Sequence, residues 1–284
     1  MSRFAVFGNR GYLGSQLAKY LVDRCVEVEG FDRPQDDVTS SSFWESFDPA
    51  SYDAILFFAG MTGTERSFDC ADQFLAVNVR GLLGLLKKLA PLGVNAPFVV
   101  FPSSRLVYKG VDCPLQEDAP KESRTVYAAN KLACEALLEA YGIRYGIRSA
   151  VLRLCVPYGN LVTHDYSYGT LGFFLEQAEK GKITLFGDGS QKRTFSHVED
   201  ICEVVWRLAS GRVDGTFNMG GDDLTLREVA EAIASARNAH VECVPWPEIA
   251  WRLESGSTYF DSTRIRKAVG IESFRLFREF VKDL

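Results

Sequence analysis

Two side chains that could move a proton stand four residues apart in the segment TVYAANKLACEALLEAYG, residues 125–142. The apolar residues of this segment follow the period of an amphipathic helix, so Tyr127 and Lys131 share one face of that helix. A phenol beside an ammonium is a possible acid/base pair, because the ammonium favours the phenolate. The same spacing also arises when an aromatic ring happens to lie beside a solvated lysine. Other parts of the chain have to decide between these two interpretations.

A glycine-rich stretch near the N-terminus predicts a phosphate-binding turn. The apolar run 3–8 leads directly into it, and a helix is expected at 12–24. Glycines allow a tight turn, close approach of the backbone to a pyrophosphate, and packing of helix on strand. The helix N-terminus adds N–H groups and a partial positive charge. The expected dinucleotide contacts in this stretch are Gly8, Arg10, Gly11, Tyr12, Leu13 and Gly14.

An acidic residue follows where the ribose of a dinucleotide would lie. Asp32 ends the second apolar run, 26–32, some 18 residues past Gly14. A carboxylate there accepts hydrogen bonds from the ribose hydroxyls and repels a 2′-phosphate, which favours NAD over NADP. Arg10 and Arg33 keep NADP as the alternative, because either guanidinium could clamp a phosphate unless both are solvated surface residues. We expect NAD to be the cofactor.

Composition argues against several classes of protein. The net charge of −5 and the pI near 5.4 give no reason to expect a nucleic-acid partner. None of the seven cysteines forms Cys-x-x-Cys, and the three histidines, His164, His197 and His240, lack metal-ligand spacing. No apolar stretch approaches the ~20 residues that span a bilayer. A cytoplasmic protein without a metal or a membrane partner is therefore expected.

The elements that position these residues are predicted by alternating patterns. Buried strands are expected at 3–8, 26–32, 53–60, 97–104 and 149–154. Between them lie helical patterns at 12–24, 40–47, 69–90 and 125–142. Such alternation is typical of an α/β fold with a doubly wound parallel sheet, the Rossmann arrangement.

The pattern changes after residue 157. Expected there are helices at 170–180, 198–210, 225–237 and 262–284, and strands near 183–189, 215–221 and 241–244. We predict a dinucleotide-binding domain over 1–156, with returning segments at about 195–219. A smaller, interleaved substrate-binding lobe is expected over 157–194 and 220–284.

These motifs, in this order, resemble the extended short-chain dehydrogenases/reductases, and among them the NAD-dependent epimerase/dehydratase family that acts on nucleotide sugars. The segment 57–67 is most similar to the UDP-glucose 4-epimerase group. The resemblance implies a nucleotide diphosphate sugar as substrate and a homodimer built on the helices at 69–90 and 125–142. The apolar residues expected at that interface include Leu82, Leu86, Leu132 and Leu137. The similar motifs are Gly8-x-x-Gly11-x-x-Gly14, FFAG (57–60), VNVRG (77–81), PSSRLVY (102–108), YAANK (127–131), LRLCVPYG (152–159), LFGDGSQKRTFSHVEDI (185–201), FNMGG (217–221) and DSTRIRKAVG (261–270).

The resemblance also implies roles for the residues that could do chemistry. Tyr127 would be the acid/base on a sugar hydroxyl or ketone, and Lys131 would hold the nicotinamide ribose and tune the phenol. Lowering a phenol pKa of ~10 by ~2–3 units takes ~3–4 kcal/mol, which adjacent positive charges can supply. Ser104, with Ser103 as the alternative, would hydrogen-bond the reacting oxygen.

Further positions carry over from the same resemblance. Beside the cofactor it places Phe58, Ala59, Gly60, Asn78 and Pro157. Arg193, and more weakly Arg252, would grip the substrate diphosphate, while His197 would be structural.

Two departures from the family pattern narrow the chemistry. Dehydratases of this family carry an Asp-Glu pair where this chain has Arg105 and Leu106, so a dehydratase is not expected. Val156 stands where an asparagine usually binds substrate. The leading hypothesis is an NAD-dependent nucleotide-sugar epimerase that passes through a 4-keto sugar. The alternatives are an NAD(P)H-dependent reductase of a 4-keto-6-deoxy nucleotide sugar and a non-catalytic dinucleotide-binding protein.

Overall fold

The computed structural model describes residues 2–163 and 168–284, which form two compact units. The first unit comprises residues 1–107, 123–153 and 202–217, and the second comprises 108–122, 154–201 and 218–284. The predicted dinucleotide-binding domain included 108–122, 154–156, 195–201 and 218–219, which fall in the second unit. The longest of these segments is 108–122. This segment is hydrogen-bonded to other parts of the second unit: the Tyr108 hydroxyl donates to Asn218 Oδ1 at 2.7 Å, and Leu115 N donates to Tyr259 O at 2.8 Å.

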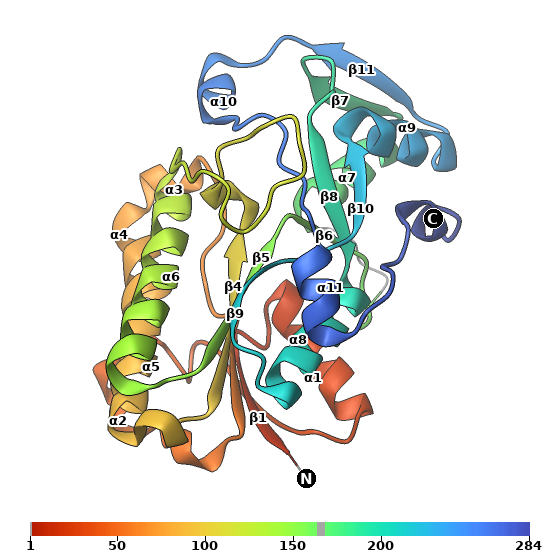
Figure 1. Cartoon of the computed structure of the whole chain (residues 1–284). Coiled ribbons are helices and arrows are strands. Elements are labelled where there is room, and N and C mark those ends of the chain that lie inside the picture. The colour runs from red at the N-terminus through yellow and green to blue at the C-terminus, as the bar shows by residue number, and fades with distance from the viewer. Residues whose placement is uncertain (1, 164–167) are drawn as a thin grey trace. The chain divides into compact units, whose positions relative to one another are not determined.

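A six-stranded sheet of order β2-β1-β3-β4-β5-β9 forms the centre of the first unit (Figure 1). The pairs β1–β2, β1–β3 and β3–β4 are parallel. Because β1 pairs with β2 on one side and β3 on the other, the winding direction reverses at β1, where open α/β sheets bind ligands. The strands are β1 (Arg3–Phe7), β2 (Glu27–Phe31), β3 (Ala54–Phe57), β4 (Phe98–Ser104), β5 (Ser149–Leu154) and β9 (Gly215–Asn218).

Helices cover both faces of this sheet, with α5 and α6 on one face and α1 and α8 on the other (Figure 1). Every residue of β3 and β4 is buried, which explains why these strands are continuous apolar runs. The predicted doubly wound α/β fold is confirmed. The helices are α1 (Tyr12–Asp23), α2 (Ser41–Ser46), α3 (Arg66–Asp69), α4 (Ala71–Phe74), α5 (Gly81–Leu89), α6 (Val126–Tyr145) and α8 (Val198–Gly211), with short turns η1 (Pro49–Ser51), η2 (Leu75–Arg80), η3 (Ala90–Asn95) and η4 (Arg105–Val107).

The single helix predicted at 69–90 is wrong in detail, because the chain there is divided into α3, α4, η2 and α5. At Cys70 the backbone leaves the helical region, with φ −119° and ψ 34°. The element η2 is a π-helix, and such turns often occur at functional sites. It carries Asn78, whose side-chain Oδ1 accepts a hydrogen bond from Met61 N at 2.7 Å and whose Nδ2 donates one to Met61 O at 3.1 Å.

The second unit contains a three-stranded sheet of order β10-β8-β6 and a parallel pair, β7–β11. The strand β8 (Lys192–His197) was not predicted, and the strand expected at 215–221 ends at Asn218. The helix expected at 262–284 is interrupted after Gly270, whose φ of +68° ends α11. The remaining elements are β6 (Val156–Tyr158), β7 (Lys182–Phe186), β10 (Asp222–Thr225), β11 (His240–Val244), α7 (Gly169–Glu179), α9 (Leu226–Ala236), α10 (Glu248–Leu253), α11 (Thr263–Val269) and α12 (Phe277–Val281).

The residues offered for a dimer interface are only partly at the surface. Leu82 and Leu86 lie on the buried face of α5 and are completely covered in the core of the first unit. The reasoning that placed these two leucines at an interface is therefore wrong, since they are already covered by their own chain. Leu132 and Leu137 of α6 are half-buried. The homodimer itself stays a prediction.

Candidate active site

The glycine turn between β1 and α1 has a backbone that side chains would disrupt. Gly8 has a φ of +79°, and a Cβ there would lie 2.7 Å from Ala59 N. A Cβ on Gly14 would lie only 2.0 Å from Gly8 O. Gly11 N donates to Gly8 O at 2.9 Å, and Gly11 is the N-cap of α1. The turn therefore fits the backbone approach that a pyrophosphate requires at a helix N-terminus.

A cavity of about 300 Å³ opens beside this turn within the first unit. Phe58, Ala59 and Gly60, which follow β3, form one wall of it. Sequence reasoning missed six lining residues, because no motif marks them. The predicted cofactor residues that line it are Gly8, Arg10, Gly11, Asp32, Arg33, Phe58, Ala59 and Gly60, and the missed ones are Phe31, Asp36, Asp37, Val38, Met61 and Val77.

The remaining predicted cofactor residues do not line this cavity. Tyr12, Leu13 and Gly14 form the first turn of α1, immediately beyond the glycine turn. Asn78 does not line the cavity itself, but its side chain holds the backbone of Met61, which does. Pro157 lies in β6 of the second unit, so its place beside a nicotinamide stays a prediction.

The carboxylate of Asp32 is fixed to the glycine turn. Its Oδ2 accepts a hydrogen bond from Arg10 N at 2.9 Å, and its Oδ1 accepts one from Arg33 N at 2.8 Å. Each oxygen keeps a further lone pair for a ribose hydroxyl. Asp37, another lining residue, accepts from the Thr39 backbone N–H, which lowers the pKa of its carboxyl. Three carboxylates and two guanidinium groups thus line the cavity, a balance that suits a ribose better than a 2′-phosphate.

Tyr127 and Lys131 both lie on the buried face of α6. The N-cap of this helix is Thr125, whose hydroxyl accepts a hydrogen bond from Ala128 N at 3.0 Å. Lys131 is 6% exposed, and its Nζ lies 5.7 Å from the centre of the Tyr127 ring. The same Nζ donates to Pro102 O of β4 at 2.6 Å. The structure therefore brings the phenol and the ammonium together at the carboxyl end of β4.

Burial lowers the pKa of Lys131 to about 8 from an ordinary value of 10.5, opposed by Cys134 and Glu135. Between pH 8 and pH 10.5 Lys131 is protonated in the unfolded chain but not in the native protein. The free energy of unfolding therefore rises with pH in this range. Burial raises the pKa of the Cys134 thiol to about 11, which works in the opposite direction above pH 9.

We therefore expect the wild type to gain about 1 kcal/mol of unfolding free energy relative to Lys131→Met between pH 7 and pH 9. Urea denaturation of both proteins without cofactor at pH 7, 8 and 9 measures this difference. Parallel pH profiles would show that Lys131 does not titrate in this range.

The two candidate serines at the end of β4 have different surroundings. The Ser103 hydroxyl donates to Glu135 of α6, whereas Ser104 Oγ accepts from Leu106 N at 3.2 Å. Successive residues of a strand point to opposite faces. Since Ser103 is committed to Glu135, Ser104 is the better candidate to meet a reacting oxygen.

The arginine expected to grip a diphosphate is buried in the second unit. Arg193 is 2% exposed, and its Nη2 lies 2.6 Å from a carboxylate oxygen of Glu254. Its Nη1 also donates to Gly256 O at 2.6 Å, so the side chain fastens the segment 254–258 to β8. A diphosphate would have to share this guanidinium with Glu254. Arg252 is exposed and forms an ion pair with Glu248 one turn earlier in α10.

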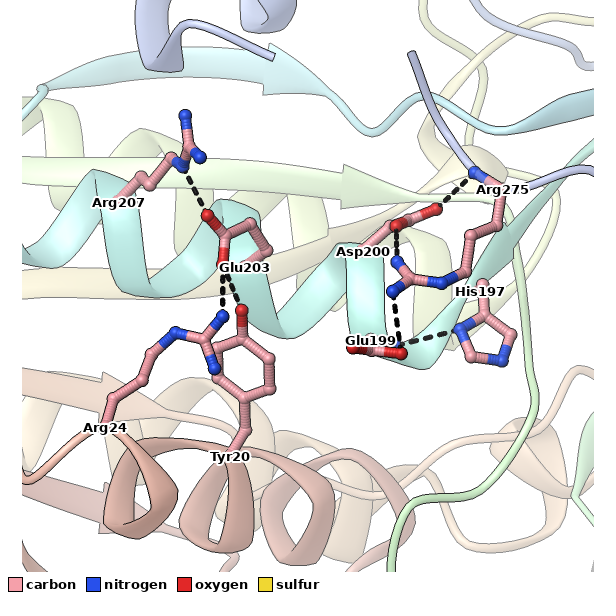
Figure 2. A network of polar contacts seen from close by, with 8 residues as sticks. All are labelled: Tyr20, Arg24, His197, Glu199, Asp200, Glu203, Arg207 and Arg275. Atoms are coloured by element: carbon pink, nitrogen blue, oxygen red, sulfur yellow. Dashed lines mark hydrogen bonds and ion pairs between the residues drawn. The ribbon is translucent and has the colours of Figure 1, made fainter. Parts of the chain in front are cut away.

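Figure 2 shows two polar clusters on α8, one at its N-terminal end and one near its middle. In the second unit His197 Nδ1 accepts from Glu199 N at 3.2 Å, and the His197 ring packs edge-on against Tyr158. Arg275 there pairs with Glu199 and Asp200. In the first unit Glu203 joins α8 to α1 through contacts with Tyr20 and Arg24, and it also pairs with Arg207 within α8. These contacts pair the charges within the fold.

Across the ranges 2–163 and 168–284, no three His, Cys, Asp or Glu side chains gather where they could hold a metal ion. His164 lies outside these ranges. Within them, too, no helix combines the length and apolar character that a membrane span requires.

Comparisons with known proteins agree with this geometry. The NAD dependent epimerase/dehydratase family matches residues 4–220. A UDP-glucuronate 4-epimerase of Thermodesulfobacterium geofontis is 27% identical, over 82% of this chain and 80% of that protein. A GDP-6-deoxy-D-mannose reductase of Pseudomonas aeruginosa is 25% identical, over 94% and 91%.

The fold has close counterparts among solved structures. The Thermus thermophilus UDP-glucose 4-epimerase in complex with NAD superposes with a TM-score of 0.85 and 24% identity, over 99% of this chain and 96% of that one. The sequence resemblance, the class of enzyme and the NAD dependence of the family are thereby confirmed. The chain belongs to the NAD dependent epimerase/dehydratase family.

Proposed function

We propose that the protein is an NAD-dependent nucleotide-sugar epimerase that inverts C4 of its substrate through a transient 4-keto sugar. The observation that carries the proposal is the buried Tyr127–Lys131 pair, held at the carboxyl end of β4 by the bond from Lys131 Nζ to Pro102 O. The substrate class follows from curated relatives, which are epimerases, dehydratases and a reductase of nucleotide sugars.

The side chains of the first unit would divide the proton chemistry among them. Bound NAD supplies a hydride acceptor that later returns the hydride. Tyr127 takes the proton of the sugar hydroxyl and later gives it back. General acid/base catalysis of this kind accelerates a reaction by ~10²–10⁴-fold. The ammonium of Lys131 stabilises the phenolate, and the Ser104 hydroxyl donates a hydrogen bond to the reacting oxygen.

The second unit would hold the nucleotide sugar. Arg193 is the proposed diphosphate ligand, sharing its guanidinium with Glu254, and the exposed Arg252 is a second candidate. Val156 is buried in β6 and offers no polar side-chain atom, so another residue must bind the hydroxyl that the family's usual asparagine contacts.

A dehydratase activity has little support from the site. Elimination of water requires a second acid and base next to the catalytic hydroxyl residue. Arg105 and Leu106, in η4, follow Ser104 directly, and neither side chain is a carboxyl group of the kind that would serve as this second acid and base.

The test is an assay of purified protein with UDP-glucose, UDP-galactose and UDP-glucuronate, followed by chromatography of the products. An epimerase interconverts C4 epimers with no added reductant and no net change in absorbance at the wavelength of NADH. The reductase alternative is favoured by the similarity to the Pseudomonas enzyme. It would instead consume one NAD(P)H for each 4-keto-6-deoxy nucleotide sugar. That stoichiometric consumption, without epimer formation, would refute the proposal.

Cofactor preference gives an independent prediction. An epimerase regenerates NAD in every cycle, so tight retention does not slow it. We expect NAD to bind at least tenfold more tightly than NADP, about 1.4 kcal/mol, because Asp32 would repel a 2′-phosphate. Calorimetric titration of the stripped protein with both cofactors measures the ratio.

Two variants identify which charges set this preference. Asp32→Asn should lower the ratio of the affinity for NAD to that for NADP. Arg33→Ala should raise this ratio if the Arg33 guanidinium reaches the 2′-phosphate of NADP. A wild-type preference for NADP would favour the reductase.

A further inference from the structure

A largely buried carboxylate lies one helical turn beyond the proposed catalytic lysine. Glu135 of α6 accepts hydrogen bonds from Arg153 Nε at 3.0 Å and Arg153 Nη2 at 2.6 Å. It also accepts a hydrogen bond from the Ser103 hydroxyl. The side chains of Arg153 and Glu135 are only 6% and 12% exposed. This fork between guanidinium and carboxylate is the kind that fixes geometry most firmly.

The contacts of Glu135 surround the positions where the chemistry is proposed. Ser103 immediately precedes Ser104, and Lys131 precedes Glu135 by four residues on the same face of α6. The end of β4 is thus tied to α6 twice, through Pro102 O to Lys131 and through Ser103 to Glu135. Arg153 extends the connection to β5. Glu135 therefore determines how β4, which carries Ser104, sits against the helix that carries Tyr127 and Lys131.

Stability alone is a poor explanation of this buried pair. A buried ion pair contributes little net stability in comparison with apolar side chains of the same volume, because both charges lose their hydration. The neighbouring positions of the same core are filled by apolar residues such as Phe101, Cys134 and Leu138. A charged pair at this depth fixes one arrangement of three elements. Of its two charges, the Glu135 carboxylate is the one that favours a charged Lys131.

We propose that Glu135 is a positioning residue of the active site, which sets the place of Ser104 and keeps the Lys131 ammonium charged beside Tyr127. The catalytic part of this inference rests on the proposed function, whereas the effect on Lys131 does not. The groups that face Lys131 are Tyr127, Cys134 and Glu135 from α6, and the Phe101 ring and Pro102 carbonyl from β4. Among them Glu135 is the carboxylate, and it opposes the loss of the lysine proton.

The test substitution is Glu135→Gln, which removes the negative charge of the side chain and keeps its shape. Glu139→Gln is the matched control, because Glu139 lies one turn further along α6 and is exposed. NMR of protein with labelled lysine side chains, without cofactor, follows the titration of Lys131, whose signal is assigned by its absence in Lys131→Met. We expect the titration midpoint to fall by about one pH unit in Glu135→Gln and to stay in place in Glu139→Gln.

Kinetics supply the second readout. In Glu135→Gln we expect kcat to fall about tenfold, with KM for the nucleotide sugar changed less than threefold and NAD binding retained. If Glu135→Gln does not fold, Glu135→Gln/Arg153→Met removes the unpaired guanidinium and is measured in the same way. An unchanged midpoint together with an unchanged kcat would overturn the inference. If the protein epimerises no nucleotide sugar but the midpoint still falls, the proposed function fails and the effect of Glu135 on Lys131 stands.

Discussion

Tyr127→Phe should lower turnover by at least about 100-fold while the protein still folds and binds NAD. The substitution removes only the ionisable hydroxyl, so the group proposed to carry the proton is lost. The ring is 9% exposed and packs edge-on against Phe74, with 6.5 Å between the ring centres. The phenylalanine ring keeps this contact, and chemical denaturation of both proteins checks that the variant is folded.

Steady-state kinetics with the active nucleotide sugar and calorimetric NAD titration measure the two effects separately. Tyr141→Phe is the matched control: Tyr141 lies on α6 as well, packs against Tyr145, and lies outside the proposed site. It should turn over at the wild-type rate. Turnover of Tyr127→Phe within a few-fold of wild type would exclude the phenol as the acid/base.

Gly14→Ala should be the most damaging single-methyl change in the cofactor site. A Cβ at this position would lie 2.0 Å from Gly8 O and 2.7 Å from Gly8 C. Both atoms belong to the backbone, so no side-chain rotation relieves the overlap, and α1 has to move away from the turn. We expect a loss of about 3 kcal/mol in the free energy of unfolding and about 100-fold weaker NAD binding, because the helix N-terminus no longer faces the pyrophosphate.

Gly11→Ala is the control for the effect on folding. Its Cβ would lie 3.2 Å from Gly8 O, a contact that a shift of a few tenths of an ångström relieves, and its φ of −74° suits any residue. Chemical denaturation should show Gly11→Ala close to wild type and Gly14→Ala far below it. Equal stabilities of Gly14→Ala and wild type would mean that the turn is looser than its backbone contacts indicate.

The parts of the site that the sequence predicted are those encoded by short-range patterns. The spacing of Gly8, Gly11 and Gly14 reflects contacts within one turn, where a Cβ meets backbone only a few residues away. Tyr127 and Lys131 share a face because a helix repeats every 3.6 residues. Asp32 follows β2, an edge strand of which Phe31 is the buried residue, so the predicted strand is present but is not buried along its length. The register of the parallel strands brings its end beside the glycine turn.

The helix breaks were not predictable in the same way. The run 69–90 is apolar enough for one helix, but the backbone turns at Cys70 and widens into the π-helix that holds Asn78. Asn78 is paired with Met61, 17 residues earlier. Helical periodicity contains no information about such a partner, so the pattern favoured an uninterrupted helix.

The sequence by itself determined the α/β class, the glycine turn between β1 and α1, the place of Asp32 at the end of β2 and the Tyr127–Lys131 pair, because each depends on local spacing or on the end of one strand. Only the tertiary structure decided that Ser103 is bound to Glu135, that Glu135 is paired with Arg153, and that Arg193 is buried against Glu254. These partners are 32, 18 and 61 residues apart. They meet because strand order and core packing bring distant segments together, and the pairing of a buried charge depends on which segments those are.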